Sequence, residues 1–394
     1  MNKETMPKRL GYKWERVVTE ENCIQAVREM LKGKKRPAKY AKIITFNKKQ
    51  IRRIIARRIV KRERFNSVAY FRAPAEEIGR NLAADLRNST WVPEPYRERL
   101  IYDDLREKWR RLKVPCLYDQ CAHHAIMRQT VPDIMARKYY YDCGSVPKAG
   151  QSRAVDILRR QLKKKKTFKY ALSMDVRHFF DTCQAWVVMH VLRTIYKDRR
   201  FLALHETTLA SMGDCLAIGF YPSPWYANFV LCVLVDRFIK QQFAPGAFFV
   251  RYVDDMLVCG NNKRLLHRLR QAISARLTPF GLRLKDSWQV YPVKKRGIAF
   301  LSYRFFPGYT LVRKKVMYRI AKCAKSAAHG LTPRIAMAMM SYKGILMRCN
   351  SYAFRTTRIF PYTNFKKCRK VIQYVAALCR TLQLSATVRR PAHA

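Results

Sequence analysis

Residues 249–258, FVRYVDDMLV, place two adjacent aspartates, Asp254 and Asp255, inside an otherwise apolar and β-prone run. Such a run predicts a β-hairpin that turns at the acid pair. Because neighbouring carboxylates repel each other near a core, a cation between them is the usual reason for such a pair. Magnesium is the expected cation, since it takes hard oxygen ligands and is shared with substrate phosphates. A surface turn that happens to carry two aspartates is the alternative for this stretch taken alone.

A second strand-like run, residues 170–181, also carries acids and reads YALSMDVRHFFD. It reaches Asp175 and continues into two aromatic residues. Asp175, Asp254 and Asp255 are therefore expected at the ends of neighbouring strands, where three carboxylates hold two metal ions. In-line phosphoryl transfer needs that arrangement.

Five blocks of the sequence resemble motifs A to E of reverse transcriptases, and they occur along the chain in the family's order with plausible spacing. Residues 252–255, YVDD, resemble motif C, and residues 175–181 resemble motif A. Residues 218–231 resemble motif B, residues 281–290 resemble motif D, and residues 297–303 resemble the primer-grip motif E. A Tyr-x-Asp-Asp sequence alone is common, whereas the ordered set is not.

Motif B departs from the best-known pattern of the family. It reads Ile-Gly-x-x-x-Ser-Pro from Ile218 to Pro224 and lacks the Pro-Gln-Gly of group II intron and retroviral enzymes. It is nearer to the Ile-Gly-x-x-x-Ser-Gln of bacterial diversity-generating retroelement enzymes, and unclassified retron-type and defence-associated lineages remain open. Diversity generation, a mobile element and phage defence are alternative roles, because one fold serves all of them.

The resemblance implies a set of catalytic and metal-binding residues. Asp175, Asp254 and Asp255 would be the catalytic carboxylates, and the Val176 carbonyl would be a further metal ligand. Two Mg²⁺ ions are implied, with Mn²⁺ as the alternative. Lys285, at the motif D position, is a candidate general acid for the leaving pyrophosphate, and a plain phosphate contact is the alternative role.

The resemblance also implies residues that contact nucleotide and primer. Arg110 and Lys148 would hold the triphosphate, and Ser223 of motif B belongs to the same nucleotide site. Phe180 would lie against the sugar and exclude a 2′-hydroxyl, whereas its neighbour Phe179 is expected in the core. The implied primer grip consists of Phe300, Leu301 and Tyr303.

Charge composition restricts the class of partner. Lys and Arg number 80 against 27 Asp and Glu, a formal net charge of +53. A field of this size requires a polyanionic partner, and nucleic acid is the expected one. No membrane association is expected, because the basic residues are spread along the chain. The first residues lack the apolar core of a signal peptide, so a cytoplasmic location is expected.

Cysteine usage agrees with a reducing compartment. The 12 cysteines include no Cys-x-x-Cys pair, which is typical of reduced thiols. Cys116, Cys121, His123 and His124 lie close together in sequence, but four zinc ligands at closed spacing are not evident. We expect these residues to pack on a helix.

The expected fold class is α+β, a polymerase right hand with fingers, a ferredoxin-like palm with an antiparallel sheet, and a helical thumb. The palm is expected to follow the order β-α-β-β-α-β. We expect a basic N-terminal extension at 1–66, fingers at 67–169, a palm with motifs A to E at 170–308, and a thumb at 309–394.

The implied function is reverse transcription, in which a DNA or RNA primer is extended with deoxynucleotides on an RNA template. A dedicated structured RNA is the expected template partner, and an accessory protein is left open. Two alternatives are a catalytically idle or non-templated member that binds structured RNA, and an RNA-copying RNA polymerase. An aromatic ring at Phe180 argues against the RNA polymerase.

The basic extension generates a prediction. Residues 32–64 carry 15 Lys and Arg and one acid, with Ile51, Ile54, Ile55 and Ile59 at helical spacing, a pattern that predicts a basic amphipathic helix. Deleting residues 1–66 should make RNA affinity less sensitive to salt. The slope of log affinity against log salt concentration should fall by several units, on the order of 0.7–0.9 for each lost phosphate contact. Filter binding of the co-purifying RNA over a salt series measures this slope. An unchanged slope would mean that these charges are only solvated.

Overall fold

The computed structural model describes residues 9–31, 67–103, 108–145, 149–164, 168–243 and 246–388. The basic segment 32–64 and Lys148 therefore lie outside the described residues. Helices and antiparallel strand pairs are combined, so the expected α+β class is confirmed. The chain divides into two compact units, and three of the boundaries fall inside strands. The first unit comprises Met1–Ala154, Leu172–Val258 and Lys263–Gln289, and the second comprises Val155–Ala171, Cys259–Asn262 and Val290–Ala394.

The first unit begins with helices and one hairpin. These elements are α1 (Lys13–Val17), α2 (Glu20–Leu31), α5 (Ser67–Arg87), β1 (Arg97–Asp103), β2 (Lys108–Val114) and α6 (Leu117–Arg137). Helix α2 buries Cys23, Ala26, Val27, Met30 and Leu31, a spacing that puts one apolar stripe against α5 and α6. The Thr19 hydroxyl accepts a hydrogen bond from Asn22 N at 3.2 Å and so caps the first turn of α2.

Cys121 and His123 pack inside the protein on helix α6, as the sequence predicted for these two residues. His123 and Cys121 are buried on this helix, and the His123 ring lies 5.4 Å from the ring of Phe220. Burial lowers the pKa of His123 to about 3, so the ring is neutral. Among the described residues, no group of three or more His, Cys, Asp and Glu side chains is arranged to hold a metal ion.

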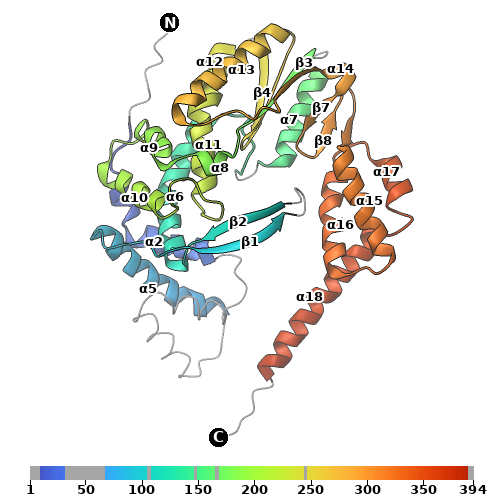
Figure 1. Ribbon diagram of the computed structural model, residues 1–394. Helices are drawn as coiled ribbons and strands as arrows, with labels where there is room; N and C mark the ends of the chain where they lie inside the picture. Colours follow the sequence, from blue (N-terminus) through green and yellow to red (C-terminus); the bar gives the residue numbers. More distant parts are fainter. Residues whose placement is uncertain are drawn as a thin grey trace. The chain divides into compact units, whose positions relative to one another are not determined.

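A four-stranded sheet has the order β4-β5-β3-β6. Its strands are β3 (Tyr170–Asp175), β4 (Ala247–Tyr252), β5 (Asp255–Gly260) and β6 (Gln289–Pro292). Helices separate β3 from β4, and α13 (Lys263–Leu277) with the short 3₁₀ helix η2 (Thr278–Phe280) separates β5 from β6 (Figure 1). This order, β-α-β-β-α-β, is the predicted split βαβ arrangement, which is therefore confirmed. Strands β4 and β5 form the predicted hairpin around Val253 and Asp254.

The helices between β3 and β4 include one irregular segment. They are α8 (Phe179–Thr182), α9 (Ala185–Arg193), α10 (Arg199–Ala210), α11 (Ser223–Leu231), the π-helix η1 (Cys232–Asp236) and α12 (Arg237–Phe243). Helix α11 is almost entirely buried, and η1 packs against α13. A π-turn inside a longer helix marks an inserted residue and often lies at a functional site.

The loop before α11 is docked on the β1–β2 hairpin. Lys113 N donates to Ile218 O at 2.9 Å, and Lys113 Nζ donates to Met212 O at 2.8 Å. Gly219 has φ +116°, and a Cβ at this position would lie 2.3 Å from Lys113 O. Only glycine combines this φ with so close a backbone approach.

The second unit contains a small sheet and a helical region. Its elements begin with helix α7 (Gln151–Lys164), which it shares with the first unit, and continue with α14 (Val293–Arg296), β7 (Ile298–Phe300), β8 (Tyr303–Phe305), β9 (Thr310–Val312), α15 (Lys314–Ala328), α16 (Pro333–Leu346), α17 (Tyr352–Arg358) and α18 (Phe365–Val388). The sheet is antiparallel with the order β7-β8-β9. Helices α15, α16 and α18 share a core around Ile320, Met339 and Leu346. The predicted helical character after residue 309 thus begins at Lys314, after a three-residue strand.

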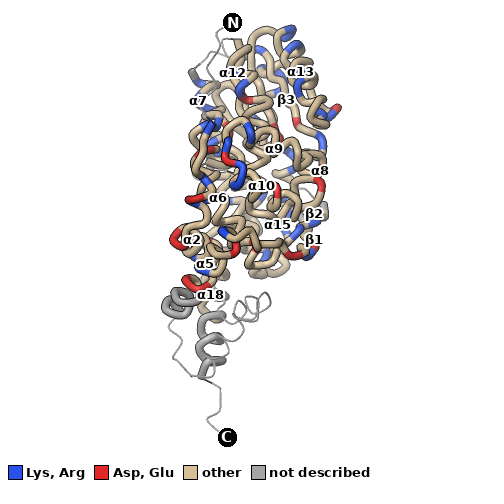
Figure 2. Tube along the Cα trace, turned by 90° about the vertical axis from the view of Figure 1, so that its left-hand side faces the viewer, with Lys and Arg blue, Asp and Glu red and all other residues tan. Residues whose placement is uncertain are grey.

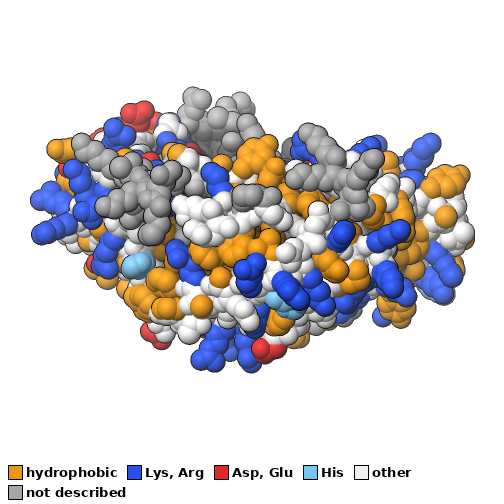
Figure 3. All heavy atoms as spheres, turned by 90° about the horizontal axis from the view of Figure 1, so that it is seen from above, with side chains coloured by type: hydrophobic (Ala, Val, Ile, Leu, Met, Phe, Trp, Pro, Cys, Tyr) orange, Lys and Arg blue, Asp and Glu red, His pale blue; other side chains and the backbone are white. Residues whose placement is uncertain are grey.

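Positive charge is distributed over the described elements. Lys and Arg occur along most of the trace, and Asp and Glu are sparse (Figure 2). On the face in Figure 3, basic side chains are interspersed with hydrophobic ones. Within the described part of the chain, no helix has both the length and the apolar character that crossing a bilayer requires.

Two glycine substitutions should have opposite effects on stability. Gly219→Ala should lower the thermal unfolding midpoint, because the positive φ alone costs about 1–3 kcal/mol for a residue with a Cβ and the new methyl meets Lys113 O. Gly344→Ala should raise it slightly, since Gly344 lies in α16 with open space around its Cβ position and Ala is favoured in helices by about 0.5–1 kcal/mol. Calorimetry of both variants checks the pair. A Gly219→Ala protein as stable as wild type would contradict the close approach.

Candidate active site

Two of the predicted carboxylates meet at the ends of adjacent strands. Asp175 is the last residue of β3, and Asp254 lies in the turn between β4 and β5. Because β5 and β3 are neighbours in the sheet, the two carboxyl groups come within hydrogen-bonding reach of each other. The sequence-based prediction that these acids converge is confirmed for this pair.

The environment of Asp175 disfavours two free negative charges. Burial raises the pKa of Asp175, a bond from Lys285 lowers it, the nearby Asp254 carboxylate raises it again, and the net shift is upward. Asp175 Oδ2 accepts a hydrogen bond from Lys285 Nζ. Asp175 Oδ1 is buried, and no described donor reaches it. A buried carboxylate oxygen without a donor, next to a second carboxylate, is a suitable ligand for a hard divalent cation.

The backbone of the motif D segment fixes Lys285 beside Asp175. Lys285 N donates to Asp175 O at 2.8 Å, and Arg177 N donates to Arg283 O at 2.8 Å. Between them, Val176 and Leu284 form an isolated antiparallel bridge. Residues 283–285 thus run antiparallel beside residues 175–177 at the end of β3. This pairing places the ammonium of Lys285 at the Asp175 carboxylate.

The other proposed metal ligands lie next to this pair in sequence. Val176 directly follows Asp175 and is fully buried. Asp255 is the first residue of β5, one position beyond Asp254, and it is half-buried. The roles of Val176 and Asp255 stay predictions.

The predicted nucleotide-binding residues differ in burial: Arg110 and Phe180 are half-buried, and Ser223 is fully buried. Arg110 lies on β2 opposite Ile101 and is half-buried. Phe180 is half-buried at the start of α8, whereas Phe179 is 2% exposed, which confirms that Phe179 is the core residue of the two. Ser223 is fully buried and its hydroxyl donates to Met212 Sδ at 3.3 Å, so in this structure the side chain makes a contact inside the protein. The nucleotide contacts of Arg110, Phe180 and Ser223 stay predictions.

The predicted primer-grip residues lie in the second unit. Phe300 and Tyr303 are paired across β7 and β8, and both are 2% exposed. Leu301 lies in the turn between them with φ +53°. Tyr303 Oη donates to Ile345 O on α16 at 3.2 Å. The buried side chains of Phe300 and Tyr303 thus flank the sharp turn that contains Leu301. Contact with a primer stays a prediction for all three residues.

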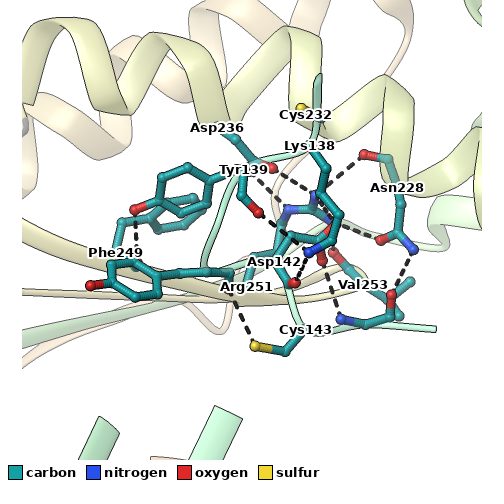
Figure 4. Close-up of polar contacts among 12 residues, drawn as sticks. Lys138, Tyr139, Asp142, Cys143, Asn228, Cys232, Asp236, Phe249, Arg251 and Val253 are labelled. Atoms are coloured by element: carbon teal, nitrogen blue, oxygen red, sulfur yellow. Dashed lines mark hydrogen bonds and ion pairs between the residues drawn. The ribbon is translucent and has the colours of Figure 1, made fainter. Parts of the chain in front are cut away.

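Sequence reasoning gave no role to Arg251, which the structure places at the centre of a buried polar network beside the turn (Figure 4). Its side chain is fully buried and contacts Asp236, Asn228 and Asp142. One signal was present in the sequence, because a charged residue inside the apolar run 249–258 requires buried partners.

A split βαβ sheet with a carboxylate pair at the ends of adjacent strands is typical of the palm of right-hand polymerases. The chain belongs to the reverse transcriptase family. The family model described as reverse transcriptase (RNA-dependent DNA polymerase) matches residues 103–305, which include all three aspartates and Lys285. No curated protein matches the sequence.

Solved telomerase structures resemble the fold at low identity. Apo telomerase from Candida tropicalis, truncated from its C-terminal domain, is 13% identical with a TM-score of 0.39 over 60% of this chain and 59% of that chain. Telomerase from Candida albicans, in complex with the TWJ fragment of telomeric RNA, is 12% identical with a TM-score of 0.42 over 69% of this chain and 57% of that chain. The chain spans less than two thirds of these structures, and the likeness adds no argument on activity or partner.

The carboxylate pair generates a prediction about stability. Asp254→Asn should raise the thermal unfolding midpoint in EDTA, because it removes a negative charge beside Asp175. The same change should abolish the stabilisation by Mg²⁺ that we expect for the wild type, about 2.7 kcal/mol at 100 times the dissociation constant. Scanning calorimetry with and without Mg²⁺ measures both effects.

Asp286→Asn is the matched control. The Asp286 side chain is 98% exposed and lies on the same motif D segment, so its loss should leave both midpoints at their wild-type values. An equal Mg²⁺ effect in wild type and Asp254→Asn would show that the ion binds elsewhere.

Proposed function

We propose that the chain is an RNA-directed DNA polymerase that adds deoxynucleotides to a primer on an RNA template by two-metal nucleotidyl transfer. The observation that carries the proposal is the Asp175–Asp254 pair, which leaves a buried carboxylate oxygen without a donor in a chain of net charge +53. Lys285 pairs with only one oxygen of Asp175, so a bound cation would offset the repulsion between the two neighbouring carboxylates.

Asp175 and Asp254 would hold two Mg²⁺ ions, with Asp255 and the Val176 carbonyl as further ligands and Mn²⁺ as the alternative metal. When bound, such ions lower the pKa of the primer 3′-hydroxyl and neutralise charge on the nucleotide phosphates. Arg110 and Lys148 would neutralise the remaining charge of the triphosphate.

Lys285 has a defined starting position in this proposal. Its ammonium lies on Asp175 Oδ2 and neutralises that carboxylate. Transfer of a proton from Lys285 to the leaving pyrophosphate would require the side chain to leave Asp175 and turn toward the nucleotide. A static phosphate contact is the alternative role, and Lys285→Arg separates the two, because guanidinium keeps the charge but does not release a proton.

The biological setting is proposed from the motif B sequence and the charge of the chain. The motif B sequence from Ile218 to Pro224 supports a bacterial enzyme near the diversity-generating retroelement, retron-type and defence-associated lineages. A dedicated structured RNA, a cytoplasmic location and an accessory protein are consistent with the charge and with such a lineage. The four-part division into a basic extension, fingers, palm and thumb at 1–66, 67–169, 170–308 and 309–394 is proposed with them. A structured RNA gene or repeat pair beside the coding sequence would support this setting.

Primer extension on an RNA template tests the activity. The wild type should extend with deoxynucleotides and Mg²⁺, and Asp254→Ala should lose incorporation while it keeps fold and RNA affinity. Asp286→Ala is the matched control and should extend normally. RNA binding without extension would support the idle RNA-binding alternative, and a preference for ribonucleotides would support the RNA polymerase.

Sugar selection gives a separate prediction. Phe180→Ala should raise incorporation of ribonucleotides relative to deoxynucleotides, because it removes the ring expected against the 2′ position. Phe179→Leu, a change in the buried neighbour, should alter stability and leave the ratio unchanged. Single-nucleotide extension measures the ratio, and an equal ratio in wild type and Phe180→Ala would place the selecting residue elsewhere.

A further inference from the structure

The turn that presents Asp254 has an unfavourable backbone conformation. Val253, the residue before Asp254, has φ +57°. This left-handed conformation is rare for a β-branched residue and persists only when its surroundings hold it. The orientation of Asp254 therefore depends on what surrounds Val253.

One restraint is the backbone of the 141–144 segment. Cys143 N donates to Arg251 O at 2.9 Å, and Arg251 N donates to Tyr141 O at 3.2 Å. A Cβ on Gly144 would lie 2.2 Å from Val253 N and 2.6 Å from Val253 Cγ2. The segment lies directly against the turn, and only glycine fits at position 144.

The second restraint is the side chain of Arg251, whose donors reach three parts of the first unit (Figure 4). Nη1 donates to Val253 O at 2.8 Å, so the guanidinium holds the strained peptide directly. Nε and Nη2 donate to the two carboxylate oxygens of Asp236 at 2.8 and 2.6 Å, in the bidentate geometry favoured by arginine.

The remaining contacts of the guanidinium reach α11 and the 141–144 segment. Nη1 donates to Asn228 Oδ1 at 3.0 Å, and Nη2 donates to Asn228 O at 3.2 Å. Nη2 also lies 3.1 Å from Asp142 Oδ2. Asn228 Nδ2 donates to Gly144 O at 2.8 Å, and Gly144 N donates to Asp142 Oδ1 at 3.2 Å, which closes the network.

We propose that Arg251 is a positioning residue that holds Asp254 in its metal-binding orientation by tying the Val253–Asp254 turn to Asp236, Asn228 and Asp142. This inference rests on the proposed function, in which Asp254 is a metal ligand. Arg251 is three residues before Asp254 and fully buried, so it acts through the turn and touches no substrate. The same ties fix motif B, through Asn228, and the 141–144 segment, through Asp142, relative to the catalytic turn.

Arg251→Lys is the principal test. Lysine keeps the charge but has one nitrogen, which cannot bridge Val253 O, Asp236 and Asn228 together. Loss of a group that orients a metal ligand is expected to weaken Mn²⁺ binding and lower kcat by about 10- to 100-fold. Mn²⁺ affinity is measured by electron paramagnetic resonance on the whole protein. kcat and the KM for deoxynucleotide are measured by primer extension, and the active fraction is measured by the pre-steady-state burst.

Arg276→Lys is the matched control. Arg276 Nε donates to Leu234 O of η1 at 2.6 Å, so this arginine also holds η1 but does not reach the turn. Its replacement should leave Mn²⁺ affinity and kcat at wild-type values. If Arg251→Lys reduces only the burst amplitude, with wild-type kcat per active site and wild-type Mn²⁺ affinity, Arg251 serves folding alone and the positioning role is wrong.

Asp142→Asn provides the test should Arg251→Lys fail to fold. It is isosteric and retains an oxygen for Gly144 N, while it removes the charge that faces Arg251. It should weaken Mn²⁺ binding and lower kcat in the same direction, and wild-type values for both would overturn the positioning role. Wild-type protein that binds Mn²⁺ but extends no primer would contradict the polymerase function, and the Mn²⁺ affinities of the variants would still decide the role of Arg251.

Discussion

The carboxylates of Asp175 and Asp254 repel each other, and the contacts around both acids hold them together against this repulsion. Neighbouring strands bring the two acids together, and Lys285 compensates one oxygen of Asp175 but not the other. Rigid strand ends keep the two acids close together, where they can share a cation. The backbone bonds between residues 175–177 and 283–285 supply that rigidity on one side.

On the other side, a buried ion network supplies the rigidity. Burial raises the pKa of Asp236 to about 6, and the guanidinium of Arg251, with a smaller contribution from Lys138, favours its ionised form in the core. Burial would also lower the pKa of Arg251, but the carboxylates of Asp142 and Asp236 outweigh it and raise that pKa. Replacing such a network with apolar residues is often neutral for stability. Its value here is geometric, since apolar side chains would not hold the carbonyl of Val253.

The parts of the fold that sequence could predict are those with local signals. The acid pair Asp254 and Asp255 inside an apolar, β-prone run predicted the hairpin, and the order of acid-bearing strands and helical segments predicted the split βαβ sheet. The contrast between Phe179 and Phe180 followed from their positions after Asp175. The resemblance of the five ordered motifs to those of reverse transcriptases identified the Asp175–Asp254 pair, which the composition of the chain could not do. The partners of Arg251 had no local signal, because Asp236 is 15 residues away and Asn228 is 23 residues away. Strand β9 was missed because three residues carry too little periodicity.

The π-helix η1 makes this region sensitive to chain length. Each residue of a regular α-helix turns the following side chains by about 100°, so the extra residue in η1 determines which way Asp236 faces. Deleting one residue between Cys232 and Asp236 would restore a regular helix, which is locally more favourable, and would turn the carboxylate away from Arg251. Among related sequences, substitutions in η1 should therefore be tolerated far better than single-residue insertions or deletions, even though no residue of η1 contacts a nucleotide in the proposed mechanism.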